Sequence, residues 1–166
     1  MESMEKEIIT RYGADVTRFV SRTVRQREDA EELVQDVFVR ALRAKDQFDA
    51  SKSSIRTWLT RIAYNEVMRY HERQSHRPMM VELNELRDDK PESLDDDPRQ
   101  AMLEMAIRRL KKEERLLLSM RYADGLSMRE MTFITGLKEG NLAVRLLRIR
   151  ERLKNIIKEI EHESQL

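Results

Sequence analysis

The chain has 166 residues, of which 38% are charged, 5% are aromatic and none is cysteine. This composition, with few glycines and prolines, favours a helical bundle over a β-sandwich or barrel, and it excludes disulfides and thiolate metal sites. The sequence has no long apolar run, so we expect neither a transmembrane span nor a secretory leader. The sequence therefore predicts an all-α protein without membrane insertion, and the cytoplasm is its default location.

The net charge of +1 hides an uneven distribution of charge along the chain. Basic and acidic side chains nearly balance in residues 1–76, whereas residues 77–100 carry four basic and eight acidic ones. Residues 101–166 carry 14 basic and 10 acidic side chains. Residues 138–158 alone carry seven basic and two acidic side chains. A local basic excess of this kind is the electrostatic pattern that nucleic-acid binding requires.

Three helices with one apolar face each are predicted in residues 1–76. The first covers about 5–25 and the second about 29–45; the third follows a loop at 48–53 and runs to about residue 73. Apolar side chains recur along each helix at i, i+3 and i+4, the pattern of a helix packed on one side. Together these helices can bury their faces as one small domain.

Residues 77–99 are predicted to form a flexible acidic linker. All three prolines lie in this segment, with the aspartate run 95–97 and no sustained helical period. A second helical domain is expected at 100–166. It begins with helices at about 99–110 and 112–123, the second of which is closed by Asp124 and Gly125.

A helix-turn-helix is predicted at the end of the second domain. Ser127 and Glu130 have the spacing of a capping box, which marks the start of its first helix. Gly136 can adopt the left-handed conformation that ends that helix, and the next helix begins near Glu139. These three signals place a sharp turn between two helices.

The last helix carries an apolar seam with a basic stripe beside it. The seam positions alternate by four and three residues, so the seam must face protein. At about 100° per residue, the stripe falls in a band of roughly 60° next to the seam, which suits contact with phosphates and base edges. The seam consists of Leu142, Leu146, Ile149, Leu153, Ile156 and Ile160, and the stripe of Asn141, Arg145, Arg148 and Arg152.

No catalytic, cofactor or metal site is predicted. His71, His76 and His162 lack metal-ligand spacing, and the chain has no glycine-rich phosphate loop. The abundant carboxylates are interpreted as helix surfaces. The sequence therefore does not predict an enzyme.

Three motifs, in this order, resemble the extracytoplasmic-function sigma factors, the small two-domain specificity subunits of bacterial RNA polymerase. The segment DAEELVQDVFVRAL at 29–42 is similar to the family's second conserved helix, and IRTWLTRIAYN at 55–65 to its promoter-melting helix. Residues 110–127, with Arg115, Arg121-Tyr122 and DGLS at 124–127, are similar to the opening of its second domain. The resemblance covers nearly the whole chain.

The resemblance implies a transcription initiation factor, for a stress or envelope-signal regulon. Its implied partners are core RNA polymerase, through the clamp of the largest subunit and the flap of the second-largest, promoter DNA, and an anti-sigma factor. The implied clamp contacts are Gln35, Asp36 and Arg40. The acidic residues at 82–97 could pass through the basic nucleic-acid channel of the polymerase, or they could form a solvated tether.

The resemblance also implies two sets of DNA contacts. The loop 48–53 and the third helix would capture an unstacked base of the minus-ten element. Trp58 could serve as a stacking platform there, but its place in the apolar period favours core packing. The implied minus-ten contacts are Phe48, Asp49, Ser53, Arg61, Asn65 and Arg69, and the implied minus-thirty-five contacts are Arg129, Asn141, Arg145 and Arg148.

The chain departs from the family pattern at two places. Ala143-Val144 and Leu147 stand where the family commonly has a Lys-Ser pair and then His, and Lys111 stands where it commonly has Pro. Val144 and Leu147 point away from the seam, and they could contact thymine methyl groups or a protein partner. A self-sufficient DNA-binding regulator is the rival function, and it would bind duplex DNA tightly without polymerase.

Overall fold

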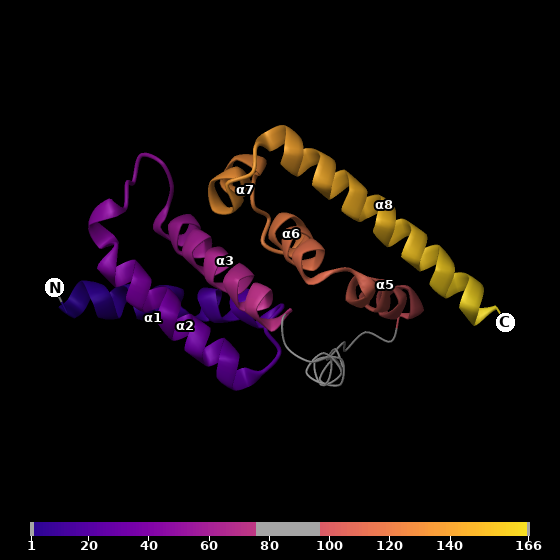
Figure 1. The fold of residues 1–166 in the computed structure, drawn as a ribbon, viewed down its shortest axis with the longest axis horizontal. Helices are drawn as coiled ribbons and strands as arrows, with labels where there is room; N and C mark the ends of the chain where they lie inside the picture. The colour runs from indigo at the N-terminus through magenta and orange to yellow at the C-terminus, as the bar shows by residue number, and fades with distance from the viewer. Residues whose placement is uncertain (1, 76–96, 166) are drawn as a thin grey trace. The chain divides into compact units, whose positions relative to one another are not determined.

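The computed structural model describes residues 2–75 and 97–165, and in these ranges the chain forms helices and no strand. The predicted all-α fold is thereby confirmed. The predicted linker lies outside the described residues except for its last three, 97–99. Figure 1 shows the helices in chain order: α1 (Glu2–Ser21), α2 (Arg27–Arg43), the 3-10 helix η1 (Lys45–Gln47), α3 (Ile55–Gln74), α5 (Pro98–Arg109), α6 (Lys112–Tyr122), α7 (Met128–Thr135) and α8 (Glu139–Ser164).

The described residues fall into two compact units. The first contains α1, α2, η1 and α3, together with residues 129–136, and the second contains α5, α6, α8 and the adjoining turns. This grouping differs from the predicted domains at α7, which the sequence assigns to the second one. Each unit is described here by itself.

In the first unit, α1, α2 and α3 pack pairwise around one apolar core. Val20, Val37, Ala63 and Val67 are completely buried, so each of the three helices contributes to that core. The hydroxyl of Tyr70, near the end of α3, donates a hydrogen bond of 2.6 Å to a carboxylate oxygen at the start of α2. This bond holds the two helices in register at the end far from the loop 48–53.

α1 ends at Ser21, before the predicted end at residue 25. The amide of Val24 still donates to the carbonyl of Val20, at 3.0 Å, but the chain turns there toward α2. Thr23 and Val24 are β-branched residues that lose side-chain freedom in a helix, and both are buried in the turn instead. Packing against the core therefore ends the helix early.

Two helices begin at side-chain caps. The Ser54 hydroxyl accepts from the amide of Thr57 at 3.1 Å, so α3 starts directly after the loop 48–53. A carboxylate oxygen of Asp97 accepts from the amide of Arg99 at 3.0 Å, and Pro98 occupies the first turn of α5, where its missing N–H costs nothing. α5 therefore begins inside the last residues of the predicted linker.

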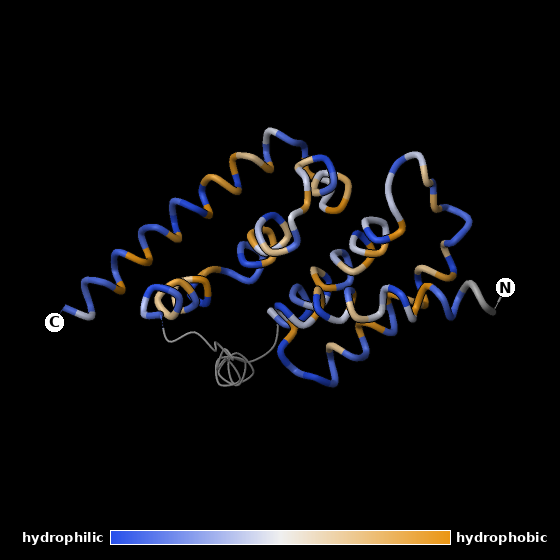
Figure 2. The backbone as a smooth tube through the Cα atoms, turned by 180° about the vertical axis from the view of Figure 1, so that it is seen from behind, coloured by the Kyte–Doolittle hydropathy of each residue, from blue (hydrophilic) through white to orange (hydrophobic). Residues whose placement is uncertain are grey.

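In the second unit, α5 and α6 both pack against α8. Figure 2 shows apolar residues recurring along one side of α8, as the predicted seam requires. Five of the six seam positions are buried and Leu153 is half-buried. The buried members are Leu142, Leu146, Ile149, Ile156 and Ile160.

Two glycines shape the turns on either side of α7. Gly125 and Gly136 have φ angles of 65° and 75°, a left-handed region that L side chains adopt only with strain. Gly125 lets the amide of Leu126 donate to the carbonyl of Met120 at 3.1 Å, which closes α6. The predicted left-handed turn at Gly136 is confirmed, and α8 begins three residues later, at the predicted position.

Candidate nucleic-acid interface

A groove of about 580 Å³ lies between α2 and α3 in the first unit. Asp36 and Arg40 line it from α2, and Asn65 and Arg69 line it from α3. The sequence predicts the first pair as polymerase contacts and the second pair as minus-ten contacts. The structure therefore brings members of both predicted sets onto one surface.

Glu66 lies at the base of this groove and was not predicted as a site residue. Its side chain is only 6% exposed, and its Oε1 lies 2.6 Å from Nε of Arg40 and 3.2 Å from Nη1 of Arg69. A carboxylate that leaves water needs such partners, because its desolvation is otherwise costly. The carboxylate thus ties together two arginines that come from different helices.

Arg40 and Arg69 are consequently not the independent surface contacts that the sequence suggests. Both side chains remain 54% exposed, so their outer donors still face the groove while one edge is held by Glu66. The ion pair of Glu66 with Arg69 could be predicted from the sequence, because the two residues are three apart on one helix. The ion pair of Glu66 with Arg40 joins α3 to α2, and no local sequence pattern indicates it.

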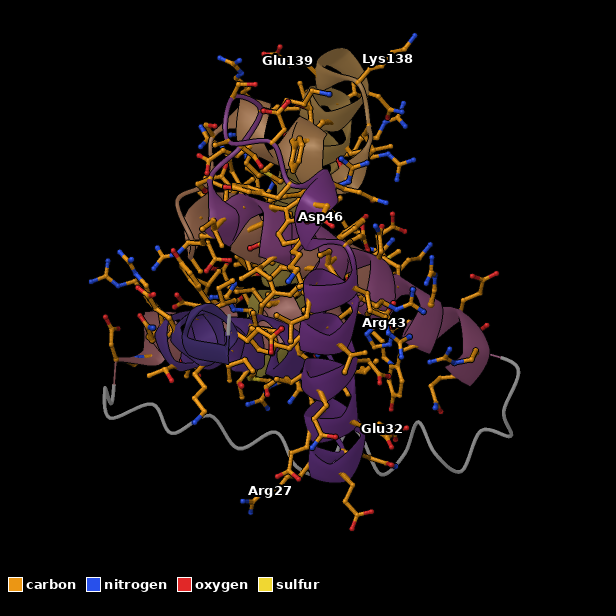
Figure 3. The ribbon with its side chains drawn as sticks, turned by 90° about the vertical axis from the view of Figure 1, so that its left-hand side faces the viewer. Arg27, Glu32, Arg43, Asp46, Lys138 and Glu139 are labelled. Atoms are coloured by element: carbon orange, nitrogen blue, oxygen red, sulfur yellow. The ribbon has the colours of Figure 1, made fainter. Side chains whose placement is uncertain are left out.

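Five further groove residues were not predicted as site residues: Val39, Arg43, Ala44, Gln47 and Ile62. Val39 is 45% exposed although it is apolar, and Arg43 follows it by one helical turn. Figure 3 shows α2 from Arg27 to Arg43, with Asp46 just beyond its end. The predicted contacts Gln35 and Arg61 are exposed on α2 and α3 but do not line the groove.

The loop 48–53 has its own internal order. The ring of Phe48 lies 5.3 Å from the ring of Trp58, at an interplanar angle of 55°. This aromatic pair fixes the loop on the first turns of α3, with both rings partly buried, and Ser53, at the end of the loop, is half-buried as well. Trp58 thus packs against Phe48 without belonging to the fully buried core, and Phe48 contacts protein rather than standing free.

Asp49 organises the turn of this loop. Its Oδ1 accepts hydrogen bonds from the hydroxyl of Ser51 at 2.6 Å and from the amide of Ser51 at 2.9 Å. The Ser51 hydroxyl first, and then the Ser51 amide, lower the pKa of Asp49 because both bonds favour the ionised form. Desolvation opposes this lowering of the pKa, and the charge of Lys52 adds a smaller contribution that lowers it. The carboxylate is thus the acceptor that closes an Asx turn.

At the start of α8, Arg145 is held by two oxygens. Its Nε donates to Oδ1 of Asn141 at 3.1 Å, and its Nη1 donates to Oε1 of Glu113, on α6, at 3.2 Å. Further along, Nε of Arg152 lies 3.7 Å from Oε1 of Glu114. Two arginines of the predicted stripe therefore face acidic side chains of α6 instead of pointing freely into solvent.

The remaining predicted contacts of this region are exposed. Arg148 lies on the outer side of α8 and makes no ion pair within residues 2–75 and 97–165, and Arg129 is exposed on α7. Val144 and Leu147, next to Arg148, are 44% and 52% exposed. Figure 3 marks Glu139, the first residue of α8, and Lys138, which precedes it.

The described part of the chain offers no group of three or more His, Cys, Asp or Glu side chains that could hold a metal ion. None of its helices is both long and apolar enough to cross a membrane.

Comparison with known proteins identifies the family. Residues 8–77 match the model of sigma-70 region 2, and residues 100–153 match that of sigma-70 region 4. The ECF RNA polymerase sigma-E factor of Escherichia coli strain K12 is 30% identical over 161 residues, which are 89% of this chain and 83% of that protein. The chain belongs to the extracytoplasmic-function sigma factors.

Another relative agrees with this assignment, and two solved structures share the fold. The sigma-E factor of Haemophilus influenzae is 29% identical and covers 90% of the chain and 85% of its own length. The sigma factor RpoE of Bartonella quintana, solved with the anti-sigma factor NepR, superposes with a TM-score of 0.67 at 22% identity and covers 95% of this chain and 98% of its own. CnrH, solved with the cytosolic domain of CnrY, superposes with a TM-score of 0.66 at 21% identity. The match covers 96% of this chain and 90% of CnrH. At these identities the two structures show a shared fold.

Membership of the sigma factors confirms the function predicted from the sequence. Proteins of this family bind core RNA polymerase and promoter DNA and direct the initiation of transcription, and the family is not one of catalytic enzymes. The region 2 match contains nearly all of the helices α1 to α3, and the region 4 match contains α6, α7 and the first half of α8. The groove of the first unit and the start of α8 therefore lie in different sigma regions.

Proposed function

We propose that this sigma factor divides promoter recognition between two domains, 1–76 and 100–166, joined by the linker 77–99. The first domain binds the polymerase clamp and the minus-ten element. The second binds the polymerase flap and reads the minus-thirty-five element through a helix-turn-helix made of α7 and α8. The region 4 match, which spans both helices, supports placing α7 in that domain.

The observation that carries the proposal is the groove shared by the two predicted contact sets. Asp36 and Arg40 contact the clamp, and Asn65 and Arg69 contact the opened minus-ten strand, while Glu66 positions both arginines. The Phe48–Trp58 pair supports the loop beside an unstacked base. Because one cluster serves both partners, docking on polymerase and capture of DNA are mechanically linked.

In the second domain, Arg145 is the central reader of the minus-thirty-five duplex. Asn141 accepts from Nε and orients the guanidinium, which reduces the entropy lost when it contacts a base edge, while Glu113 is the ion-pair partner that DNA would replace. Arg148 contacts a base edge or phosphate beside it, and Arg129 contacts phosphate. This arrangement follows the general geometry in which the first turns of a recognition helix meet the major groove.

We further propose that the protein works in the cytoplasm, has no catalytic activity of its own and serves a stress or envelope-signal regulon. The nucleotidyl transfer of transcription is carried out by the polymerase. An anti-sigma factor is the expected inhibitor, because a similar fold, RpoE of Bartonella quintana, was solved with the anti-sigma factor NepR. Release of that inhibitor would be the inducing step.

Transcription in vitro tests the proposal. The full chain is combined with core polymerase on a library of templates with randomised upstream and minus-ten elements, and the transcripts are sequenced. Arg145→Ala should lower transcription from the preferred promoter by the equivalent of about 1–3 kcal/mol, the value of a base-reading arginine. Lys158→Ala is the matched control, since it removes the same charge from an exposed site in the second half of α8.

Two results would contradict the proposal. A folded Arg145→Ala protein that transcribes like the unchanged chain would remove Arg145 from the minus-thirty-five interface. Tight, specific binding of duplex DNA by the chain alone, with no polymerase-dependent transcript, would favour the rival function of a self-sufficient regulator.

A further inference from the structure

The outer side of α8 carries apolar side chains that folding does not explain. Val144 and Leu147 are about half exposed, and Val144 lies about 160° around the helix from the centre of the buried seam, at 100° per residue. The exposed face of an amphipathic helix is ordinarily polar. We name Val144 and Leu147 the apolar reading patch.

The surroundings of the apolar reading patch indicate nucleic acid as its occupant. Arg148 adjoins Val144 and makes no ion pair in the described part of the chain, and residues 138–158 carry seven basic and two acidic side chains. A small apolar patch inside a basic surface complements a polyanion that also has apolar groups. A protein interface, by contrast, needs about 800 Å² on each partner and about 20–30 residues.

The position of the patch along the helix also fits the major groove. Val144 and Leu147 lie in the first three turns of α8, the part of a recognition helix that meets base edges. Gly140 precedes Val144 by one turn, and the space beside it is open, so the backbone can approach a base closely. Glu151 follows Leu147 by one turn, and its carboxylate disfavours contact with phosphate beyond that point.

We infer that Val144 and Leu147 contact the 5-methyl groups of thymines in the minus-thirty-five element. In the major groove, the thymine methyl is the apolar feature that distinguishes the bases, and it needs no polar reader. This inference rests on the proposed function and deepens it, because it names the base feature that the outer side of α8 recognises. Arg145 and Asn141 supply hydrogen bonds on the neighbouring side of the helix.

Deoxyuridine tests the inference directly, because it differs from thymidine only in lacking that methyl group. Once the library has given the preferred element, each thymine in either strand of its minus-thirty-five part is replaced singly by deoxyuridine. The full chain with core polymerase should then lose about fourfold in transcription at one or two positions, the effect of one methyl group leaving an apolar contact. The other positions should not change.

The variant that carries both Val144→Ala and Leu147→Ala should give equal transcription, within about 1.5-fold, from the thymine and deoxyuridine templates. Asn155→Ala, at an exposed position of α8 outside the patch, should keep the full sensitivity to deoxyuridine. Both substituted residues of the double variant are exposed, so its melting temperature should match that of the unchanged chain. A selection with the double variant should also relax its preference at the sensitive positions.

Three results would overturn the inference: no thymine in the preferred element, no effect of deoxyuridine on the unchanged chain, or an equal effect on the chain and the double variant. The last two are expected if the patch serves a protein partner instead. The absence of any polymerase-dependent transcript from the unchanged chain would be a different failure, because it would overturn the proposed function itself.

Discussion

A single carboxylate fixes the geometry of the groove in the first unit. Glu66 is buried and accepts from Arg40 and Arg69, so its charge is neutralised by two side chains that stay half exposed. Removing one partner of a buried ion pair leaves the other charges poorly compensated, which costs more than the pair itself contributes. The cluster therefore contributes to the stability of the first unit as well as to the shape of its surface.

Glu66→Gln should destabilise the first unit by about 1–3 kcal/mol, because the neutral amide keeps the shape but replaces charge-assisted hydrogen bonds with weaker ones. Urea unfolding followed by circular dichroism measures this loss. Glu72→Gln, at an exposed position on the same helix, is the control and should change the free energy of unfolding by less than about 0.5 kcal/mol. Equal effects of the two substitutions would contradict this role of Glu66.

The sequence predicts most of the fold but only part of the site. Apolar periodicity locates the helices and the seam of α8, because burial of one face depends on local spacing alone. It cannot show that Arg40 is paired with Glu66, or that Arg145 is paired with Glu113, because each pair joins two helices. The exposure of Val39 likewise depends on how α1 and α3 pack against α2, because neither helix covers this position.

At the scale of elements, the turns around α7 depend on glycine. Gly136 has a φ of 75° and ends α7 at the predicted place. Elsewhere a departure from the family pattern is explained by a local bond: the amide of Lys111 donates to the Glu114 carboxylate at 3.0 Å at the start of α6. A proline at position 111 has no amide hydrogen and could not make this bond.

Gly136→Ala should destabilise the protein by about 1–2 kcal/mol, since an L side chain in the left-handed region is strained even where space is open. Gly140→Ala is the matched control. That position is helical and open, so the same added methyl group should be neutral or stabilising by up to about 1 kcal/mol. Thermal unfolding of both variants distinguishes the effects, and similar shifts in Tm would contradict the account of the turn.

At the scale of the whole molecule, the small net charge limits binding to DNA in the absence of polymerase. The basic excess is local, and Glu113 and Glu114 already pair with Arg145 and Arg152. These pairs lower the number of basic side chains of the stripe on α8 that can release counterions from phosphate. Specific binding must draw on the contacts of both sigma regions together.

The chain alone should accordingly bind duplex promoter DNA with a weak dependence on salt. If about three or four phosphates are contacted, log K should fall with log salt with a slope of about −3, and Arg148→Ala should reduce that slope by about 1 if Arg148 meets phosphate. Fluorescence anisotropy between about 50 and 200 mM salt measures both values. A slope near −8 would show a far larger phosphate footprint than the structure offers.

The pairing of Arg145 with Glu113 has a consequence for the search for promoters along a genome. On random DNA, Arg145 exchanges its ion pair with the Glu113 carboxylate for one with a phosphate. Because the two ion pairs have similar interaction free energies, this exchange contributes little to the free energy of non-specific binding. A correct element adds a base edge in register, and only there does the exchange become favourable. Glu113 on α6 therefore competes with DNA for Arg145. This competition shortens the time that the protein spends on non-specific sites, and it also lowers the affinity for the correct site.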